Sequence, residues 1–169
     1  IEMTTDDAWF RDTAATYVIN GKGEKRANHW HFNAYGGLVD GLYFPWDKDE
    51  QIALKMAELS GCRRYRPDDM ILEGGSITLV VTDQCLLSPG RTCSAVLEEE
   101  EDPESIWPKF HKKFEPWSEE LRAYMDEHLK DYLGVEKVIW VKEGIDPEET
   151  NGHIDDVATF IAPGVMACI

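Results

Sequence analysis

The chain has 169 residues, enough for one domain, and its apolar fraction of 43% with six tryptophans supports a packed core and excludes a wholly disordered protein. The net charge of −16 argues against a nucleic-acid partner, because a polyanion would be repelled, whereas a cationic ligand is compatible with it. No apolar stretch approaches the length of a membrane span and no signal peptide is recognisable, so no membrane contact is expected.

A polar cluster at Asp12 precedes the first predicted hairpin. Apolar runs at residues 16–19 and 30–35 predict two strands, and residues 20–23 between them have the composition of a turn. This order, a polar loop followed by a hairpin, returns twice later in the chain.

The clearest helix signal covers residues 48–60. Asp47 is a suitable N-cap, Glu50 stands three residues later in the capping-box position, and Gly61 can end the helix in a left-handed turn. A weak strand signal follows at residues 63–65. The first unit is therefore predicted to consist of a hairpin, a helix and a strand.

The same order begins again at Glu73. Residues 77–81 and 85–87 predict a second hairpin, a helix is predicted at residues 118–133, and a strong strand signal covers residues 138–141. One face of this helix is predicted to be apolar: Leu121, Tyr124, Met125, Leu129 and Tyr132.

A third polar loop, at residues 152–155, precedes a hairpin predicted from residues 157–161 and 165–169. The fold class is therefore predicted to be α/β, built from repeated ββαβ units. Units that pack around an axis bring equivalent loops to one place. The residues expected to converge there are Asp12, Glu73, His153 and Asp155, which would form a catalytic constellation.

Residues 98–117 interrupt this repeat. The segment is acidic at residues 98–102 and then aromatic and basic, so we interpret it as an exposed insertion. Its aromatic side chains either tie a long loop to the surface or contact a partner, such as a second copy in a homo-oligomer.

The cysteines show no spacing typical of a zinc site and no C-x-x-C pair. Reduced, mostly buried thiols in a cytoplasmic protein are therefore expected, with no bound metal or other cofactor. The four residues are Cys62, Cys85, Cys93 and Cys168.

Six segments of the chain resemble agmatine deiminases, which belong to the arginine deiminase superfamily. They are DDAWFRDT (6–13), FNAYGG (32–37), LEGGS (72–76), CLLSPGR (85–91), LGVEKVIWV (133–141) and ETNGHIDD (149–156). The resemblance implies an internal fragment of a fivefold pseudo-symmetric α/β propeller, the pentein fold, made of ββαβ repeats. Residues 1–169 would supply about three of its five repeats, with the insertion at 98–117.

The reaction implied by this resemblance is the hydrolysis of agmatine to N-carbamoylputrescine and ammonia, a step of putrescine biosynthesis. Asp12 and Asp155 would hold the planar guanidinium in forked hydrogen bonds. Glu73 would orient His153, which protonates the departing ammonia and then activates water. The chain is thus expected to belong to a hydrolase of linear amidines.

Three further residues are assigned to substrate binding by the same resemblance. Trp9 would pack on the substrate, Glu149 would meet its distal ammonium, and Gly152 lies in the same loop as His153. The family attacks the substrate with a cysteine thiolate that follows a glycine-rich stretch ending in His-Cys. No cysteine here has that context, so the nucleophile is expected to be missing from this chain.

Several alternatives stay open at this point. Asp12 could pair with Arg11, Glu73 could be a turn residue, Trp9 could lie in the core, and Glu149 could belong to a solvated face. The substrate could be arginine or peptidylarginine, or the chain could be a guanidinium-binding fragment without turnover. A metal-dependent hydrolase is the least favoured hypothesis, because carboxylate-rich sites are unspecific. Its ligands would be His153, Asp155 and Asp12, with His29 and His31 nearby in sequence.

Overall fold

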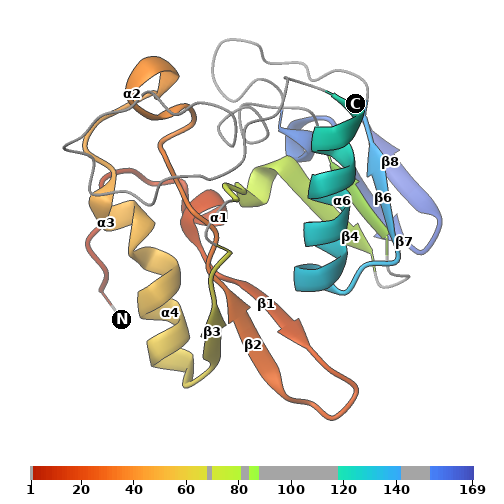
Figure 1. Ribbon diagram of the computed structural model, residues 1–169, viewed down its shortest axis with the longest axis horizontal. Coiled ribbons are helices and arrows are strands. Elements are labelled where there is room, and N and C mark those ends of the chain that lie inside the picture. The colour runs from red at the N-terminus through yellow and green to blue at the C-terminus, as the bar shows by residue number, and fades with distance from the viewer. Residues whose placement is uncertain (1, 68–69, 81–83, 88–117, 142–152) are drawn as a thin grey trace.

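Three successive units, drawn from red to blue in Figure 1, make up the described part of the chain. The structure is a computed structural model, and it describes residues 2–67, 70–80, 84–87, 118–141 and 153–169. The predicted insertion at 98–117 lies outside the described residues. None of the helices in these ranges is long and apolar enough to span a bilayer.

The first unit is a three-stranded sheet covered by a helix. Strand β1 pairs antiparallel with β2, and β2 pairs parallel with β3, in the order β1-β2-β3. Helix α4 lies beside this sheet (Figure 1) and packs Ala53 and Ala57 against Ala27 of β2. The elements are α1 (Phe10–Thr13), β1 (Thr16–Ile19), β2 (Lys25–Asn28), α2 (Gly37–Asp40), α3 (Asp47–Glu50), α4 (Ile52–Ser60) and β3 (Arg63–Tyr65).

The second unit has the same topology, which confirms the predicted ββαβ repeat. Its strands follow the order β4-β5-β6, with β4 and β5 antiparallel and β5 and β6 parallel. Helix α6 buries Leu121, Met125 and Leu129 in a core shared with Leu72 and Ile77. The elements are η1 (Gly74–Ser76), β4 (Ile77–Val80), β5 (Gln84–Leu87), α6 (Glu119–Leu133) and β6 (Lys137–Trp140).

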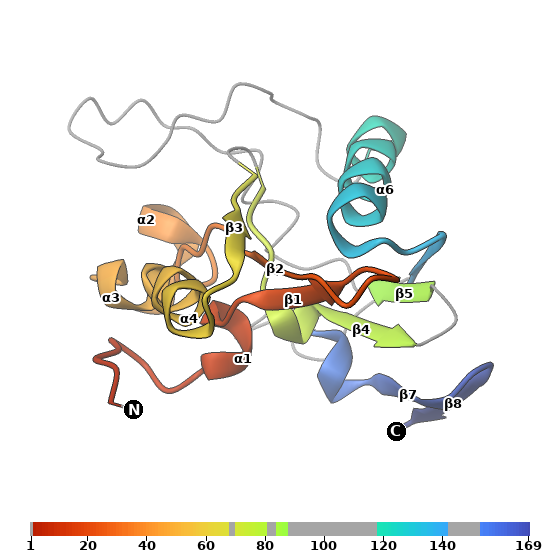
Figure 2. The same ribbon diagram turned by 90° about the horizontal axis from the view of Figure 1, so that it is seen from below.

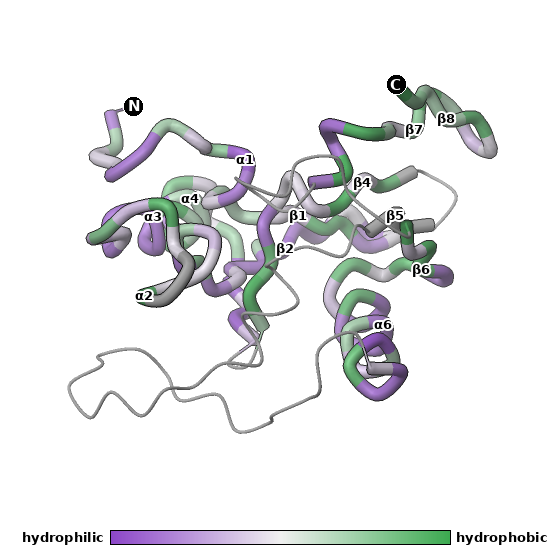
Figure 3. Tube along the Cα trace, turned by 90° about the horizontal axis from the view of Figure 1, so that it is seen from above, coloured by the Kyte–Doolittle hydropathy of each residue, from purple (hydrophilic) through white to green (hydrophobic). Residues whose placement is uncertain are grey.

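The third unit consists of a short helical turn and a hairpin; the hairpin was predicted, whereas the turn lies in what was expected to be a polar loop. The turn η2 (Ile154–Asp156) leads into β7 (Ala158–Ala162), which pairs antiparallel with β8 (Val165–Cys168). The hairpin is coloured mainly as hydrophobic in Figure 3, whereas α1 and the segment leading into β7 are hydrophilic. In Figure 2 the short helical segments α1, η1 and η2 lie next to one another, at the junction of the three units.

The ends of helix α6 follow the local signals in the sequence. Ser118 caps its first turn by accepting a hydrogen bond from the Leu121 N–H at 3.1 Å. Gly134 ends it in the left-handed conformation, with φ of 71°. Gly61 ends α4 in the same way, with φ of 62°.

The prediction of one continuous helix with a capping box at Asp47 is wrong. The helix is divided into α3 and α4, and Asp47 is the first helical residue after Trp46. Glu50 does not turn back to the helix end, because it is buried and accepts a hydrogen bond from the Phe32 N–H at 2.7 Å. A tertiary partner has displaced the local capping interaction.

The second strand predicted at residues 30–35 is also wrong. The hairpin closes earlier, with Ile19 opposite Lys25, so the second strand is β2. The apolar residues of 30–35 instead enter the core, where Phe32 and Tyr35 pack edge to face with ring centroids 5.3 Å apart. Tyr35 has φ of 69°, a left-handed backbone that a strand excludes.

The expectation of mostly buried thiols is wrong for one of the two cysteines whose side chains are described. Cys62 is partly buried and packs against the Ala-rich core of the first unit, whereas Cys168 is exposed on β8.

Candidate functional site

Asp12 is held at the junction of the units by two donors from different segments. It lies in α1 and is 9% exposed. Its Oδ1 accepts from the Gly75 N–H at 2.7 Å, and its Oδ2 accepts from the Tyr35 hydroxyl at 2.9 Å. Both donors hold the carboxylate in a fixed orientation.

Glu73 and His153 form a buried pair at equivalent positions of two units. Glu73 directly precedes η1 and His153 directly precedes η2, and the two residues are 0% and 3% exposed. The His153 Nε2–H donates to Glu73 Oε2 at 2.8 Å. His153 Nδ1 faces the other way and lies 3.9 Å from Asp12 Oδ1.

Gly75 marks the point where these side chains meet. A methyl group added at Gly75 would overlap His153 Nδ1 and lie 3.0 Å from Asp12 Oδ1 and 3.1 Å from Asp155 Oδ2. The structure therefore brings together the four residues expected to converge, although they come from three units. Glycine is required here because His153 Nδ1 already occupies the space that a side chain would fill.

Asp155 is the most exposed member of the group and is paired with a cation of the chain itself. Its Oδ2 lies 2.9 Å from Arg11 Nε, with the two side chains 33% and 56% exposed. Asp12, the residue that we considered as a partner of Arg11, is held by Gly75 and Tyr35 instead.

Burial and neighbouring charges shift the pKa values of these groups. Burial would lower the pKa of His153, but the hydrogen bond and charge of Glu73, with the charges of Asp12 and Asp155, outweigh it and raise the pKa above its ordinary value. Burial raises the pKa of Asp12 and the pKa of Asp155, against the opposing attraction of His153. The imidazole is therefore favoured in its protonated form, which suits a proton donor.

Three residues of the site were not predicted from the sequence. Tyr35 and Gly75 lie in recognised motifs but were given no role, and Arg11 was considered only as a partner of Asp12. The role of Tyr35 could not be predicted from the hydrophobic pattern, which indicated a strand. Tyr35 instead has a left-handed backbone, and its side chain is buried with the hydroxyl bonded to Asp12. The adjacent glycines after Glu73 were the available signal for a close approach at Gly75.

The remaining candidate residues have different outcomes. Trp9 is 58% exposed, so the alternative of a core tryptophan is wrong. Glu149 and Gly152 lie outside the described residues.

His29 and His31 belong to a separate buried cluster, with Glu50 and two arginines. The His29 Nε2–H donates to the Glu50 carbonyl and its Nδ1 accepts from Arg64, each at 2.9 Å, while Arg66 contacts His31 and the Glu50 carboxylate. Burial, reinforced by the charge of Arg66, lowers the pKa of His29 to about 4. Within the described ranges, no group of three or more His, Cys, Asp or Glu side chains is arranged to hold a metal ion.

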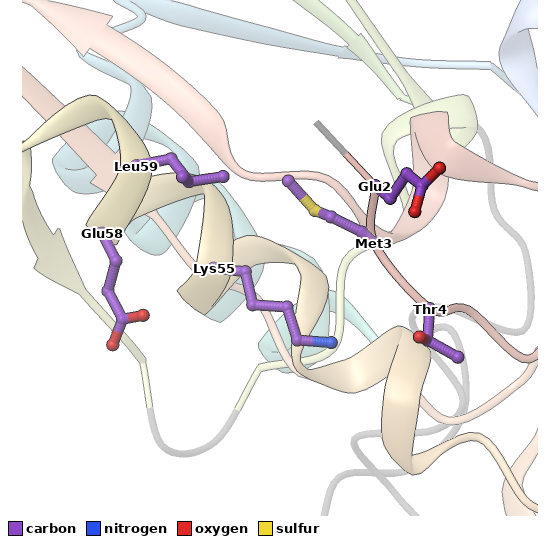
Figure 4. Close-up of a pocket in the computed structure, with 6 residues that line it drawn as sticks. All are labelled: Glu2, Met3, Thr4, Lys55, Glu58 and Leu59. Atoms are coloured by element: carbon purple, nitrogen blue, oxygen red, sulfur yellow. The ribbon is translucent and has the colours of Figure 1, made fainter.

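A hollow of about 500 Å³ lies elsewhere, between the N-terminal segment and α4 (Figure 4). It is an open surface feature whose lining residues are distinct from the converging group. They are Glu2, Met3, Thr4, Lys55, Glu58 and Leu59.

Comparison with known proteins identifies the family to which this arrangement is related. The profile of the Porphyromonas-type peptidyl-arginine deiminases matches residues 1–102 and 118–169. A Streptococcus mutans protein assigned by name to the agmatine deiminases is 50% identical over the whole chain, which spans 41% of that relative. The agmatine deiminase of Ectopseudomonas mendocina is 41% identical over 97% of the chain, which spans 39% of it.

A solved structure is similar over nearly all of this chain. The structure of the Enterococcus faecalis agmatine deiminase, described as catalysing its reaction, matches with a TM-score of 0.77 and 46% identity. The match covers 98% of this chain and 40% of that one. The chain therefore spans about two fifths of the length of its relatives.

Proposed function

The chain belongs to the Porphyromonas-type peptidyl-arginine deiminase family, and from this we propose that it carries part of the active site of an agmatine deiminase. The reaction is the hydrolysis of agmatine to N-carbamoylputrescine and ammonia. The observation that carries the proposal is the convergence of Asp12, Glu73, His153 and Asp155 around Gly75. Agmatine is favoured over arginine or peptidylarginine because relatives 41% and 50% identical bear the agmatine deiminase name.

We place the chain within a fivefold α/β propeller. The two complete ββαβ units and the third hairpin would supply about three of its five repeats, and the proposed insertion at 98–117 falls between β5 and α6 in the sequence. The polar loops of successive units meet at η1 and η2, which is the arrangement that units packed around an axis produce.

The two aspartates are proposed to bind the guanidinium. A guanidinium is planar and cationic, and it donates paired hydrogen bonds to carboxylates in a forked geometry. Asp12 Oδ1 and Asp155 Oδ2 lie 3.0 and 3.1 Å from the position of a methyl group on Gly75, so the two carboxylates are close neighbours beside His153 Nδ1. The exposed indole of Trp9 is available to cover the substrate.

The His153–Glu73 pair is proposed to move the proton. Glu73 occupies Nε2, so the atom that faces the substrate is Nδ1. A protonated Nδ1 can donate to the departing ammonia after a thiolate attacks the guanidinium carbon, and the neutral ring can then accept a proton from the attacking water. The raised pKa of His153 favours the form that this sequence of steps requires first.

The thiolate is proposed to come from outside these 169 residues. Of the two cysteines whose side chains the structure describes, Cys62 packs against the core of the first unit and Cys168 lies on the exposed strand β8, and neither is assigned as the nucleophile. The carboxylates and the imidazole described here would serve a thiol brought by another repeat.

Calorimetry with agmatine tests the guanidinium site, with putrescine as the matched diamine that lacks the guanidinium. We expect agmatine to bind the chain more tightly than putrescine, and Asp155→Asn to remove this difference. Equal affinities for the two ligands would refute the assignment. Ammonia and N-carbamoylputrescine production after addition of a polypeptide that supplies the other repeats, with His153→Ala as the control, then tests the chemistry.

A further inference from the structure

Arg11 lies beside the guanidinium site and links all three units. Its Nε lies 2.9 Å from Asp155 Oδ2 in the third unit, and its Nη2 donates to the Ile77 carbonyl of β4 at 3.3 Å. Its backbone belongs to α1 of the first unit and is followed directly by Asp12. A residue with three such connections is in a position to set the geometry of the site.

We propose that Arg11 is a positioning residue, which fixes the carboxylate of Asp155 at the distance from Asp12 that a guanidinium ligand requires. The proposal rests on the proposed function of the same site, and it adds a residue to which the reaction itself gives no task. Because Arg11 and Asp12 are neighbours in one short helix, a single element then governs both carboxylates.

The backbone at Arg11 is fixed as firmly as its side chain. A methyl group added at Gly74 would overlap the Arg11 carbonyl oxygen, so α1 packs directly on the backbone of η1. The neighbouring Gly75 N–H holds Asp12 at 2.7 Å. The side chain of Arg11 therefore extends from an anchored backbone towards Asp155.

Arg11 does not need to leave for a ligand to bind. Its Nε engages Oδ2 of Asp155, and its Nη2 is directed to the Ile77 carbonyl. A carboxylate offers about four lone-pair positions on its two oxygens. Asp155 can therefore bind Arg11 and still accept hydrogen bonds from the guanidinium of the ligand. This geometry distinguishes a positioning role from competition with the substrate.

The charges of the site favour such a cation. Three carboxylates meet one imidazole at the junction, and like charges in a partly buried site repel one another. Burial raises the pKa of Asp155, and the charges of His153 and Arg11 oppose this effect. An ionised Asp155 is the form that binds a guanidinium.

Two variants of Arg11 and one control test the proposal by calorimetry with agmatine on the 169-residue chain. We expect Arg11→Gln to weaken agmatine binding by about tenfold, because Asp155 loses its anchor. Arg11→Lys keeps the charge but not the planar, forked guanidinium, so the affinity of this variant for agmatine should lie between those of the wild type and Arg11→Gln. Lys48→Gln removes the remote Lys48–Asp6 ion pair, also 2.9 Å long, and should leave agmatine binding within about twofold of the wild type.

A carboxyl ¹³C NMR titration of Asp155 supplies a readout that does not depend on agmatine. We expect Arg11→Gln to raise the pKa of Asp155, and Arg11→Lys to restore it in part. Circular dichroism verifies the fold, and Arg11→Lys decides the question if Arg11→Gln does not fold.

The outcomes separate this proposal from the proposed function. Wild-type affinity in both Arg11 variants would overturn the positioning role, and so would tighter binding in Arg11→Gln, because Arg11 would then compete with the ligand. If the wild-type chain fails to distinguish agmatine from putrescine, the proposed function fails. The NMR titration then decides alone: a raised pKa of Asp155 supports the role of Arg11, and an unchanged pKa overturns it.

Discussion

Gly75→Ala should damage both the site and the stability of the chain. The added methyl group would overlap His153 Nδ1 and lie 3.0 Å from Asp12 Oδ1. His153 cannot simply move away, because it is 3% exposed and its Nε2 is bonded to Glu73. The substitution must either strain the packing or break this hydrogen bond.

The expected loss follows from these two contributions. Overpacking costs about 1–3 kcal/mol, and a hydrogen bond to a charged partner contributes about 1.5–3 kcal/mol. The two costs do not add fully, because a shift of His153 that relieves the overpacking is the same shift that breaks its hydrogen bond. We therefore expect the free energy of unfolding to fall by about 2–4 kcal/mol. The pKa of His153 should also fall as its contact with Glu73 weakens.

Gly21→Ala is the matched control, because a methyl group there meets no atom within 4 Å. Urea denaturation of both variants should show a change of at most about 1 kcal/mol for Gly21→Ala. An NMR titration of the histidine ring protons reports the pKa of His153. Equal stability of Gly75→Ala and Gly21→Ala, with an unchanged pKa of His153, would show that Gly75 does not lie in close contact with His153.

Three further predictions concern the same group of residues. Glu73→Gln should lower the pKa of His153 in the NMR titration, because the amide keeps an acceptor but removes the charge; an unchanged value would contradict the pairing. Tyr35→Phe removes a hydrogen-bond donor to Asp12. Urea denaturation should therefore show a free energy of unfolding lower by about 1.5–3 kcal/mol, and an NMR titration should show a higher pKa of Asp12. Wild-type values in both measurements would count against this contact. The pKa of His153 is above 6.5 in the folded chain, so its stabilising contribution should be complete below pH 6.5 and disappear as the pH rises through the folded value. The difference in unfolding free energy between wild type and His153→Gln should therefore shrink with rising pH, and a difference that grows would reverse the sign of this linkage.

The parts of the fold that could be predicted from sequence are those fixed by neighbouring residues. Helix α6 has its cap, its apolar face and its terminal glycine within one continuous segment, so its extent was predicted nearly to the residue. The capping box predicted at Glu50 was wrong because the partners of Glu50 are distant in the sequence. A capping box was compatible with the local sequence, but the Phe32 N–H and Arg66 are stronger partners that only the folded chain brings near.

The site shows the same division. The convergence of Asp12, Glu73 and His153 could be expected because they occupy equivalent loops of a repeat, so topology alone brings them together. Tyr35 and Arg11 could not be assigned in this way. The first depends on a left-handed turn, and the second on the close approach of α1 to the third unit.

Each side chain of the site is held by a group from a different unit. Gly75 of the second unit holds Asp12 of the first, Glu73 of the second holds His153 of the third, and Arg11 of the first holds Asp155 of the third. No unit can therefore form its share of the site before the units have packed together. This dependence explains why substitutions at Gly75, Glu73 or Arg11 should affect stability and site geometry together. Trp9 is exposed and takes no part in these contacts, so a change there can alter ligand binding while leaving the fold intact.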